Sequence, residues 1–135
     1  MASIFSKIVT GDIPSYKIAE DENYYAFLDI NPLAKGHTLV IPKMETDYIF
    51  DIEDEQLGGL LVFAKKVGKA IESVISCKRI GVTVIGLEVP HAHIHLIPLN
   101  TLYDMDFKQP KLSFTNDELA QTAEKIREAF DTIIL

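Results

Sequence analysis

Two segments of the chain repeat their hydrophobic residues at helical spacing, and the segments around them have the short apolar runs of strands. In residues 53–77 the apolar positions recur three and four residues apart, which predicts one long amphipathic helix. These positions are Leu57, Leu60, Leu61, Ala64, Val67, Ile71, Val74 and Ile75. The acidic residues at 53–55 stand where the positive end of a helix dipole favours negative charge.

Gly58 and Gly59 interrupt this helical pattern. Each glycine costs about 1 kcal/mol relative to alanine inside a helix. Two explanations are open. Either a sheet or a second subunit approaches the helix closely at this point, or the first turns of the helix are weak and frayed.

A second helix is predicted after a loop at residues 100–114. Thr115 and Glu118 have the spacing of a capping box, in which each side chain accepts a hydrogen bond from the backbone of the other residue. The helix beyond this box has one apolar face, formed by Leu119, Ala123, Ile126 and Phe130. This pattern leaves open whether the helix covers a functional site, extends a subunit contact or packs on a sheet.

Runs of β-branched and aromatic residues bounded by turn residues predict five strands. They occupy residues 16–20, 24–30, 36–42, 79–85 and 91–99, and a short helical segment at 4–9 precedes them. Strands that are segregated from the helices indicate an α+β fold rather than a doubly wound one.

The composition narrows the function classes. The 135 residues fit one domain, which we assign to residues 1–135. A net charge of −7 argues against a general nucleic-acid-binding protein, which needs a basic surface, but a few local donors can still hold a small anion. We expect a cytoplasmic protein without a membrane segment, because neither a signal peptide nor a long apolar run is recognisable. The single cysteine, Cys77, closes the helical pattern and is interpreted as a small core residue.

Three of the four histidines lie at alternate positions of the last predicted strand. His91, His93 and His95 therefore share one face of that strand, about 7 Å apart along it. The alternate positions on the opposite face are apolar: Ala92, Ile94 and Leu96. The core is expected on the apolar face, so the histidine face is the one available to a cleft.

This row of histidines fits chemistry at phosphorus. A neutral imidazole is a nucleophile near neutral pH, and a second one can donate a proton or hold a phosphate oxygen. Attack on phosphorus would divide one difficult step into two through a covalent intermediate. A metal site is the alternative, because two histidines separated by one residue on a strand commonly bind zinc.

The segment HAHIHLIP at 91–98 resembles the signature of the histidine triad (HIT) family, in which histidines alternate with apolar residues. Three further segments match the family in order: IFSKIV with GDIP at 4–14, AFLDINP at 26–32 and GHTLVIPK at 36–43. The resemblance covers about residues 3–99 and leaves 100–135 as a C-terminal loop and helix extension. It implies a five-stranded antiparallel sheet with a long central helix and a C-terminal helix, joined as a homodimer.

The resemblance also implies roles for the histidines. His93 corresponds to the family's nucleophile, which attacks the α-phosphorus and forms a nucleotidyl-histidine intermediate. His95 would contact the phosphate and the leaving group. His91 and His37 would support the nucleophile through hydrogen bonds.

The nucleotide site is carried over in the same way. Asp29 matches the carboxylate that accepts the ribose hydroxyls, although it could equally be a turn residue. The apolar walls around the base match Ile4, Phe5, Ile8, Phe27, Ile30 and Leu39, each of which could also be simple core. Glu88 and Val89 are expected beside the nucleotide.

Two departures from the family pattern change these expectations. Cysteines that bind a structural zinc in many relatives are Ser3 and Ser6 here, and a further ligand position is Glu45, so we predict no structural zinc. The loop before the triad is shortened. Ile85 and Leu87 stand near positions where an asparagine and a glutamine normally help to hold the phosphate.

The sequence therefore predicts a nucleotide hydrolase or transferase that cleaves a phosphoramidate or phosphoanhydride-type linkage at the α-phosphate. It would act without a cofactor on a small nucleotide, a purine mononucleotide conjugate. A nucleotide-binding module with little catalysis and a metal-dependent enzyme that uses the histidine row are the alternatives.

Overall fold

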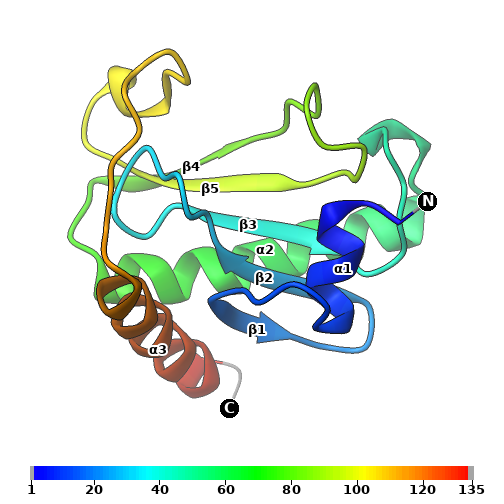
Figure 1. The fold of residues 1–135 in the computed structure, drawn as a ribbon, viewed down its shortest axis with the longest axis horizontal. Helices are drawn as coiled ribbons and strands as arrows, with labels where there is room; N and C mark the ends of the chain where they lie inside the picture. Colours follow the sequence, from blue (N-terminus) through cyan, green and yellow to red (C-terminus); the bar gives the residue numbers. More distant parts are fainter. Residues whose placement is uncertain (1, 134–135) are drawn as a thin grey trace.

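A computed structural model describes residues 2–133 of the chain, which form three α-helices, five strands and two 3-10 helices (Figure 1). In chain order these are α1 (Ile4–Thr10), β1 (Lys17–Glu20), β2 (Tyr24–Leu28), β3 (Thr38–Pro42), η1 (Ile49–Asp51), α2 (Asp54–Val74), β4 (Arg79–Thr83), β5 (Ile94–Leu99), η2 (Leu102–Met105) and α3 (Asn116–Ile133). None of the helices in this part of the chain is both long and apolar enough to cross a membrane.

The strands form one antiparallel sheet in the order β1-β2-β3-β5-β4, which confirms the predicted α+β architecture. Figure 1 shows α1 on one side of this sheet and α2 on the other, with α3 beside α2. Both faces of β2 are consequently buried. Tyr24, Ala26 and Leu28 pack toward α2, whereas Tyr25 and Phe27 pack toward α1.

The long helix α2 confirms the predicted helical pattern but differs from it in phase and length. Leu61, which the pattern placed on the apolar face, is 56% exposed, and Phe63 is buried instead. The helix ends at Val74 because Ile75 is already extended. Cys77 lies beyond the helix and is only partly buried, so its interpretation as a core residue was wrong.

The two strands next to the triad are shorter than predicted. β4 ends at Thr83 rather than 85, and β5 begins at Ile94 rather than 91. The ladder cannot continue here, because Pro42 of β3 has no N–H to donate and its carbonyl oxygen accepts a hydrogen bond from the His91 ring. The segment 91–93 is therefore extended backbone that precedes the strand.

Gly59 has the close neighbour that one of the two explanations required. A Cβ atom at this position would overlap the hydroxyl group of Tyr24, which reaches α2 from β2 and donates a hydrogen bond to the Gln56 carbonyl at 2.9 Å. Gly58, in contrast, faces open space. The sheet therefore accounts for Gly59 but not for Gly58.

We expect Gly59→Ala to lower the free energy of unfolding by about 1–3 kcal/mol, because the buried Tyr24 ring cannot move away freely. Urea denaturation of the wild type, Gly59→Ala, Tyr24→Phe and the double variant would measure this effect. The loss should be smaller in the Tyr24→Phe background, where the clashing hydroxyl is gone. Equal losses in both backgrounds would show that the close approach is not the cause.

The C-terminal extension consists of an ordered loop and a helix that packs on the domain. The predicted capping box is present, with Thr115 N–H donating to Glu118 Oε1 at 2.8 Å and Glu118 N–H donating to Thr115 Oγ1 at 3.1 Å. The apolar face of α3 packs against α2 and β1. Of the three roles left open for this helix, the structure shows packing on the domain.

Candidate active site

A cavity of about 540 Å³ opens between α1, the ends of β2, β3 and β5, and the 85–89 loop. His93 and His95 line it. All nine residues that were predicted to contact the nucleotide also line it: Ile4, Phe5, Ile8, Phe27, Asp29, Ile30, Leu39, Glu88 and Val89. His91 and His37 are fully buried behind the lining.

The side chains of residues 91–96 alternate between the two faces as predicted, although His95 is the only triad histidine that lies within β5. Ala92, Ile94 and Leu96 belong to the core on the α2 side, as predicted. The three histidines are buried on the opposite side, where Phe5 of α1 meets the rings of His91 and His93 edge-on.

His93 is oriented by the backbone of its own segment. Its Nδ1 lies 2.8 Å from the carbonyl oxygen of His91, and a carbonyl can only accept. Nδ1 therefore carries the proton, and Nε2 keeps its lone pair. Since Nδ1 is engaged and the side chain lines the cavity, Nε2 is the nitrogen that a ligand can reach.

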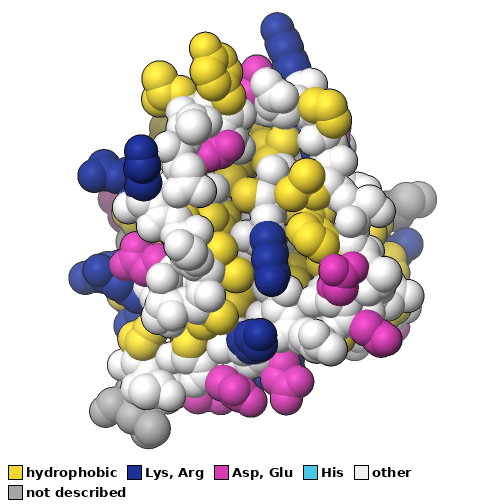
Figure 2. Space-filling view, turned by 90° about the vertical axis from the view of Figure 1, so that its left-hand side faces the viewer, with side chains coloured by type: hydrophobic (Ala, Val, Ile, Leu, Met, Phe, Trp, Pro, Cys, Tyr) yellow, Lys and Arg dark blue, Asp and Glu magenta, His cyan; other side chains and the backbone are white. Residues whose placement is uncertain are grey.

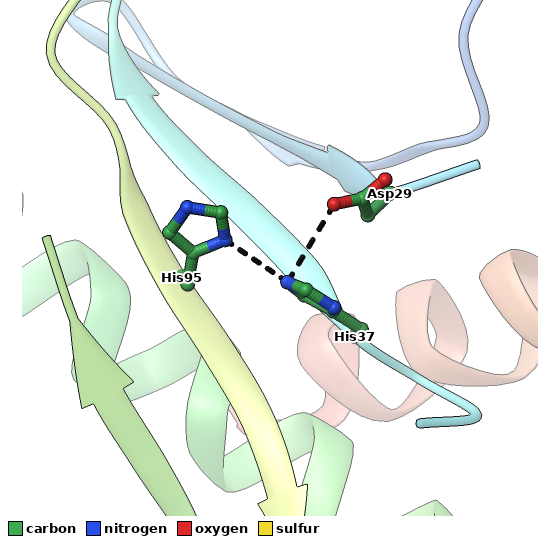
Figure 3. A group of neighbouring side chains, drawn as sticks. All are labelled: Asp29, His37 and His95. Atoms are coloured by element: carbon green, nitrogen blue, oxygen red, sulfur yellow. Dashed lines mark hydrogen bonds and ion pairs between the residues drawn. The ribbon is translucent and has the colours of Figure 1, made fainter. Parts of the chain in front are cut away.

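His37 and His95 form a second unit, joined between Nε2 of His37 and Nδ1 of His95 at 3.0 Å (Figure 3). The Leu33 backbone N–H donates to Nδ1 of His37 at 3.0 Å, so His37 carries its proton on Nε2 and donates to His95. Neutral His95 must then carry its proton on Nε2. Burial lowers the pKa of His37 to about 3 and that of His95 to about 4, which keeps both rings neutral near pH 7.

His91 connects the triad to the N-terminal helix. Its Nε2 donates to the Pro42 carbonyl at 2.8 Å, and Nδ1 accepts from the Ser3 hydroxyl at 2.8 Å. Glu45 accepts from the Ser3 backbone N–H and from the Ser6 hydroxyl, and these hydrogen bonds lower its pKa to about 2. Ser3, Ser6 and Glu45, the positions compared with zinc ligands in the sequence, thus meet around His91 as a hydrogen-bonded cluster.

This cluster does not fit a structural zinc ion. Two of its four side chains are serine hydroxyls, which are poor zinc ligands, and the lone pair of His91 Nδ1 already accepts a hydrogen bond. The same hydrogen bonds connect α1 to the segment that carries Glu45. They provide a link between these parts of the chain that needs no metal.

Asp29 follows β2 at the edge of the cavity. Its Oδ1 accepts a hydrogen bond from Asn31 N–H at 2.8 Å, and its Oδ2 lies 3.6 Å from Nε2 of His37 (Figure 3). Burial raises the pKa of this carboxyl group. Asp29 is thus both a turn residue and a cavity residue. Its Oδ1 takes part in the turn, whereas Oδ2 does not.

Asp29, His37 and His95 also lie close enough to be considered as metal ligands, with donor atoms within 4.8 Å of one another. The hydrogen bonds of His37 oppose this. A metal at Nε2 would require the proton on Nδ1, where the Leu33 N–H already donates. The geometry favours a hydrogen-bonded pair of histidines.

The loop between β5 and α3 also contributes to the cavity, which was not predicted because this segment lies outside the family resemblance. Phe107 and Lys111 of this loop line the cavity. The Phe107 ring centroid is 4.9 Å from that of His95 and 6.2 Å from that of His37. The cavity is further lined by Ile13, Pro14, Ser15, Leu28, Asn31, Ile85, Gly86 and Leu87, which sequence reasoning had not assigned to the nucleotide.

Comparisons with known proteins agree with this arrangement. The family model described as HIT domain matches residues 10–102. Adenosine 5'-monophosphoramidase hnt1 of Schizosaccharomyces pombe is 39% identical over 129 residues, which cover 93% of this chain and 96% of that protein. The crystal structure of a Hit-like protein from Bartonella henselae superposes with a TM-score of 0.82 at 32% identity, covering 94% of this chain and 95% of the other. A Zn-bound histidine triad family protein from Mycobacterium smegmatis has a TM-score of 0.81 at 26% identity, with 99% and 96% covered.

Proposed function

Because the chain belongs to the histidine triad (HIT) family, we propose that it cleaves nucleoside 5'-phosphoramidates, or similarly linked nucleotides, at the α-phosphate through a nucleotidyl intermediate on His93. The observation that carries this proposal is the hydrogen bond from His93 Nδ1 to the His91 carbonyl oxygen. Because Nδ1 is engaged in this hydrogen bond, Nε2 of His93 is available as the nucleophile in the cavity. The name of the fission-yeast relative supports a phosphoramidate as the substrate.

The reaction has two displacements at phosphorus. In the first, Nε2 of His93 forms a bond to the α-phosphorus while the bond from phosphorus to the leaving amine breaks, and the amine takes up a proton from water. In the second, water attacks the same phosphorus, the bond to His93 breaks, and a nucleoside monophosphate leaves. The Nε2–H of His95 donates a hydrogen bond to the phosphate or the leaving group.

The nucleoside half of the substrate occupies the apolar part of the cavity. Phe5, Ile8, Phe27 and Leu39 form one packed cluster whose surface lines the cavity, which suits a flat purine base. The free oxygen of Asp29 accepts the ribose hydroxyls. In this proposal the ribose lies between the base and the two cavity-facing histidines.

Release of a fluorescent amine from a nucleoside 5'-phosphoramidate tests this function directly. The purified wild type should release the amine and the nucleoside monophosphate in equal amounts. Rapid acid quenching followed by intact-mass analysis should reveal the nucleotidyl adduct. Tight nucleotide binding without turnover would instead favour a binding module, for which the apolar residues Ile85 and Leu87 at the normally polar positions are the supporting observation.

We also propose that the chain forms a homodimer through the edge of its sheet. β4 is an edge strand, and an apolar groove lies between it, η1 and the start of α2. Tyr48, Phe50 and Leu61 expose large apolar surfaces along this groove. A second copy related by a twofold axis would pair β4 with β4 and cover these surfaces, and it would give Gly58 a neighbour.

The cytoplasmic location and the lack of nucleic-acid binding stay predictions from the sequence.

Two matched substitutions separate this interface from general surface effects. Val82 of β4 lines the groove and is 53% exposed, whereas Val62 of α2 is 54% exposed but lies outside the groove. We expect Val82→Lys to halve the mass measured by light scattering, because it buries a charge at the contact. Val62→Lys should leave the mass unchanged. A monomeric wild type at micromolar concentration would refute the proposal.

A further inference from the structure

The charges around the cavity do not match an anionic substrate unless the C-terminal loop takes part. Two carboxylates, Asp29 and Glu88, line the cavity. His37 and His95 are held neutral by burial, so they supply hydrogen bonds but little positive charge. Among the described residues that line this cavity, Lys111 is the only lysine or arginine.

Lys111 is held in place by its own loop. Its Nζ donates to the Phe107 carbonyl at 3.0 Å and stands 5.1 Å above the centre of the Phe107 ring. This ring in turn packs against the His95 ring in a T-shaped contact, with the centroids 4.9 Å apart. The ammonium group is therefore one aromatic ring away from the histidine that faces the phosphate.

The loop is anchored at both of its ends. At its start, Asp104 accepts hydrogen bonds from the backbone N–H groups of Asn100 and Thr101. Near its end, Leu112 N–H donates to the Pro32 carbonyl at 2.8 Å, just beyond Asp29. Figure 2, which views the side of the molecule on which this loop lies, shows basic side chains next to hydrophobic ones. The anchors fix the side of the cavity on which Lys111 stands.

The 85–87 segment lines the same cavity with apolar side chains at two of its three positions. Ile85 and Leu87 occupy positions near which polar phosphate contacts were expected, and Leu87 is 88% exposed. An anion in the cavity therefore gains nothing from these two side chains. A compensating donor has to come from another element.

We propose that Lys111 is the phosphate-binding cation of this site, supplied by the C-terminal loop in place of the polar side chains missing from the shortened 85–90 loop. The inference rests on the proposed function, since it assumes that the cavity takes a nucleotide. Lys111 Nζ exchanges a neutral carbonyl acceptor for a phosphate oxygen when the substrate enters. A lysine suits this role as a flexible point charge with three donors.

Equilibrium binding of adenosine 5'-monophosphate and of adenosine, measured by calorimetry, tests the role of Lys111 without requiring turnover. Lys111→Met should weaken binding of the monophosphate by about 10- to 100-fold and leave adenosine binding unchanged, because only the phosphate contact is lost. Lys111→Arg should restore most of the affinity. Lys108→Met, in the same loop but outside the cavity lining, is the matched control and should behave as the wild type.

The outcomes distinguish this inference from the proposed function. Unchanged binding of the monophosphate to Lys111→Met would overturn the role of Lys111 and leave the proposed function standing. Equal losses for the monophosphate and for adenosine would also overturn it, since they indicate a displaced loop. A wild type that binds neither ligand would overturn both proposals. Lysine-dependent binding without turnover would keep the inference and reject the catalytic function.

Discussion

Replacing His93 with alanine is expected to lower kcat for phosphoramidate cleavage by about 1,000-fold or more, because the substitution removes the atom that forms the covalent intermediate. The side chain lines the cavity, and within residues 2–133 its one hydrogen bond is to the adjoining backbone. Nucleotide affinity should therefore change little. Steady-state release of the fluorescent amine, together with calorimetric binding of adenosine 5'-monophosphate, measures both quantities.

The smaller variant His93→Gly provides a control for this assignment. It leaves a space beside Phe5 into which free imidazole can diffuse, so added imidazole should restore part of the lost activity. The nucleotidyl adduct should be missing from His93→Ala after acid quenching. Equal rates for the wild type and His93→Ala would remove His93 from the role of nucleophile.

Local signals predicted the helices of this fold well. The capping box at Thr115 and the apolar spacing of α2 are readable in the sequence because each is set by residues within one or two turns. The error at Leu61 and Phe63 has a tertiary cause. The sheet packs on the stripe that contains Phe63, and the wider stripe that also included Leu61 fits the hydrophobic pattern equally well.

The site was predictable where one strand carries it and unpredictable where separate segments meet. Alternation placed the triad on one face, and the ordered matches to the family placed His37 and Asp29 beside it. No local signal connects Phe107 or Lys111 to His95, because the loop reaches the site only through distant contacts. One example is the hydrogen bond from Leu112 to Pro32.

The buried pair His37 and His95 should make the fold sensitive to acid. Both histidines have their pKa lowered by burial, to about 3 and about 4, whereas an unfolded histidine titrates near 6.5. Below pH 6.5 these two histidines bind protons in the unfolded chain but not in the folded chain. Their contribution to the free energy of unfolding is therefore fully present above that pH and is lost as the pH falls. We expect the free energy of unfolding to drop by about 2–4 kcal/mol between pH 7 and pH 5.

Urea denaturation at half-unit pH steps measures this loss, and His37→Asn is the matched variant. Asparagine keeps an acceptor for the Leu33 N–H but does not titrate, so near pH 5 the pH slope should fall by about 1.4 kcal/mol per pH unit whatever the stability at pH 7. The window above pH 5 keeps Glu45 out of the measured change, because the pKa of Glu45 is lowered in the folded protein. Burial raises the pKa of Asp29, but Asp29 is present in both proteins, so its contribution is common to the wild type and to His37→Asn. An unchanged slope in His37→Asn would contradict the view that His37 stays neutral in the folded protein.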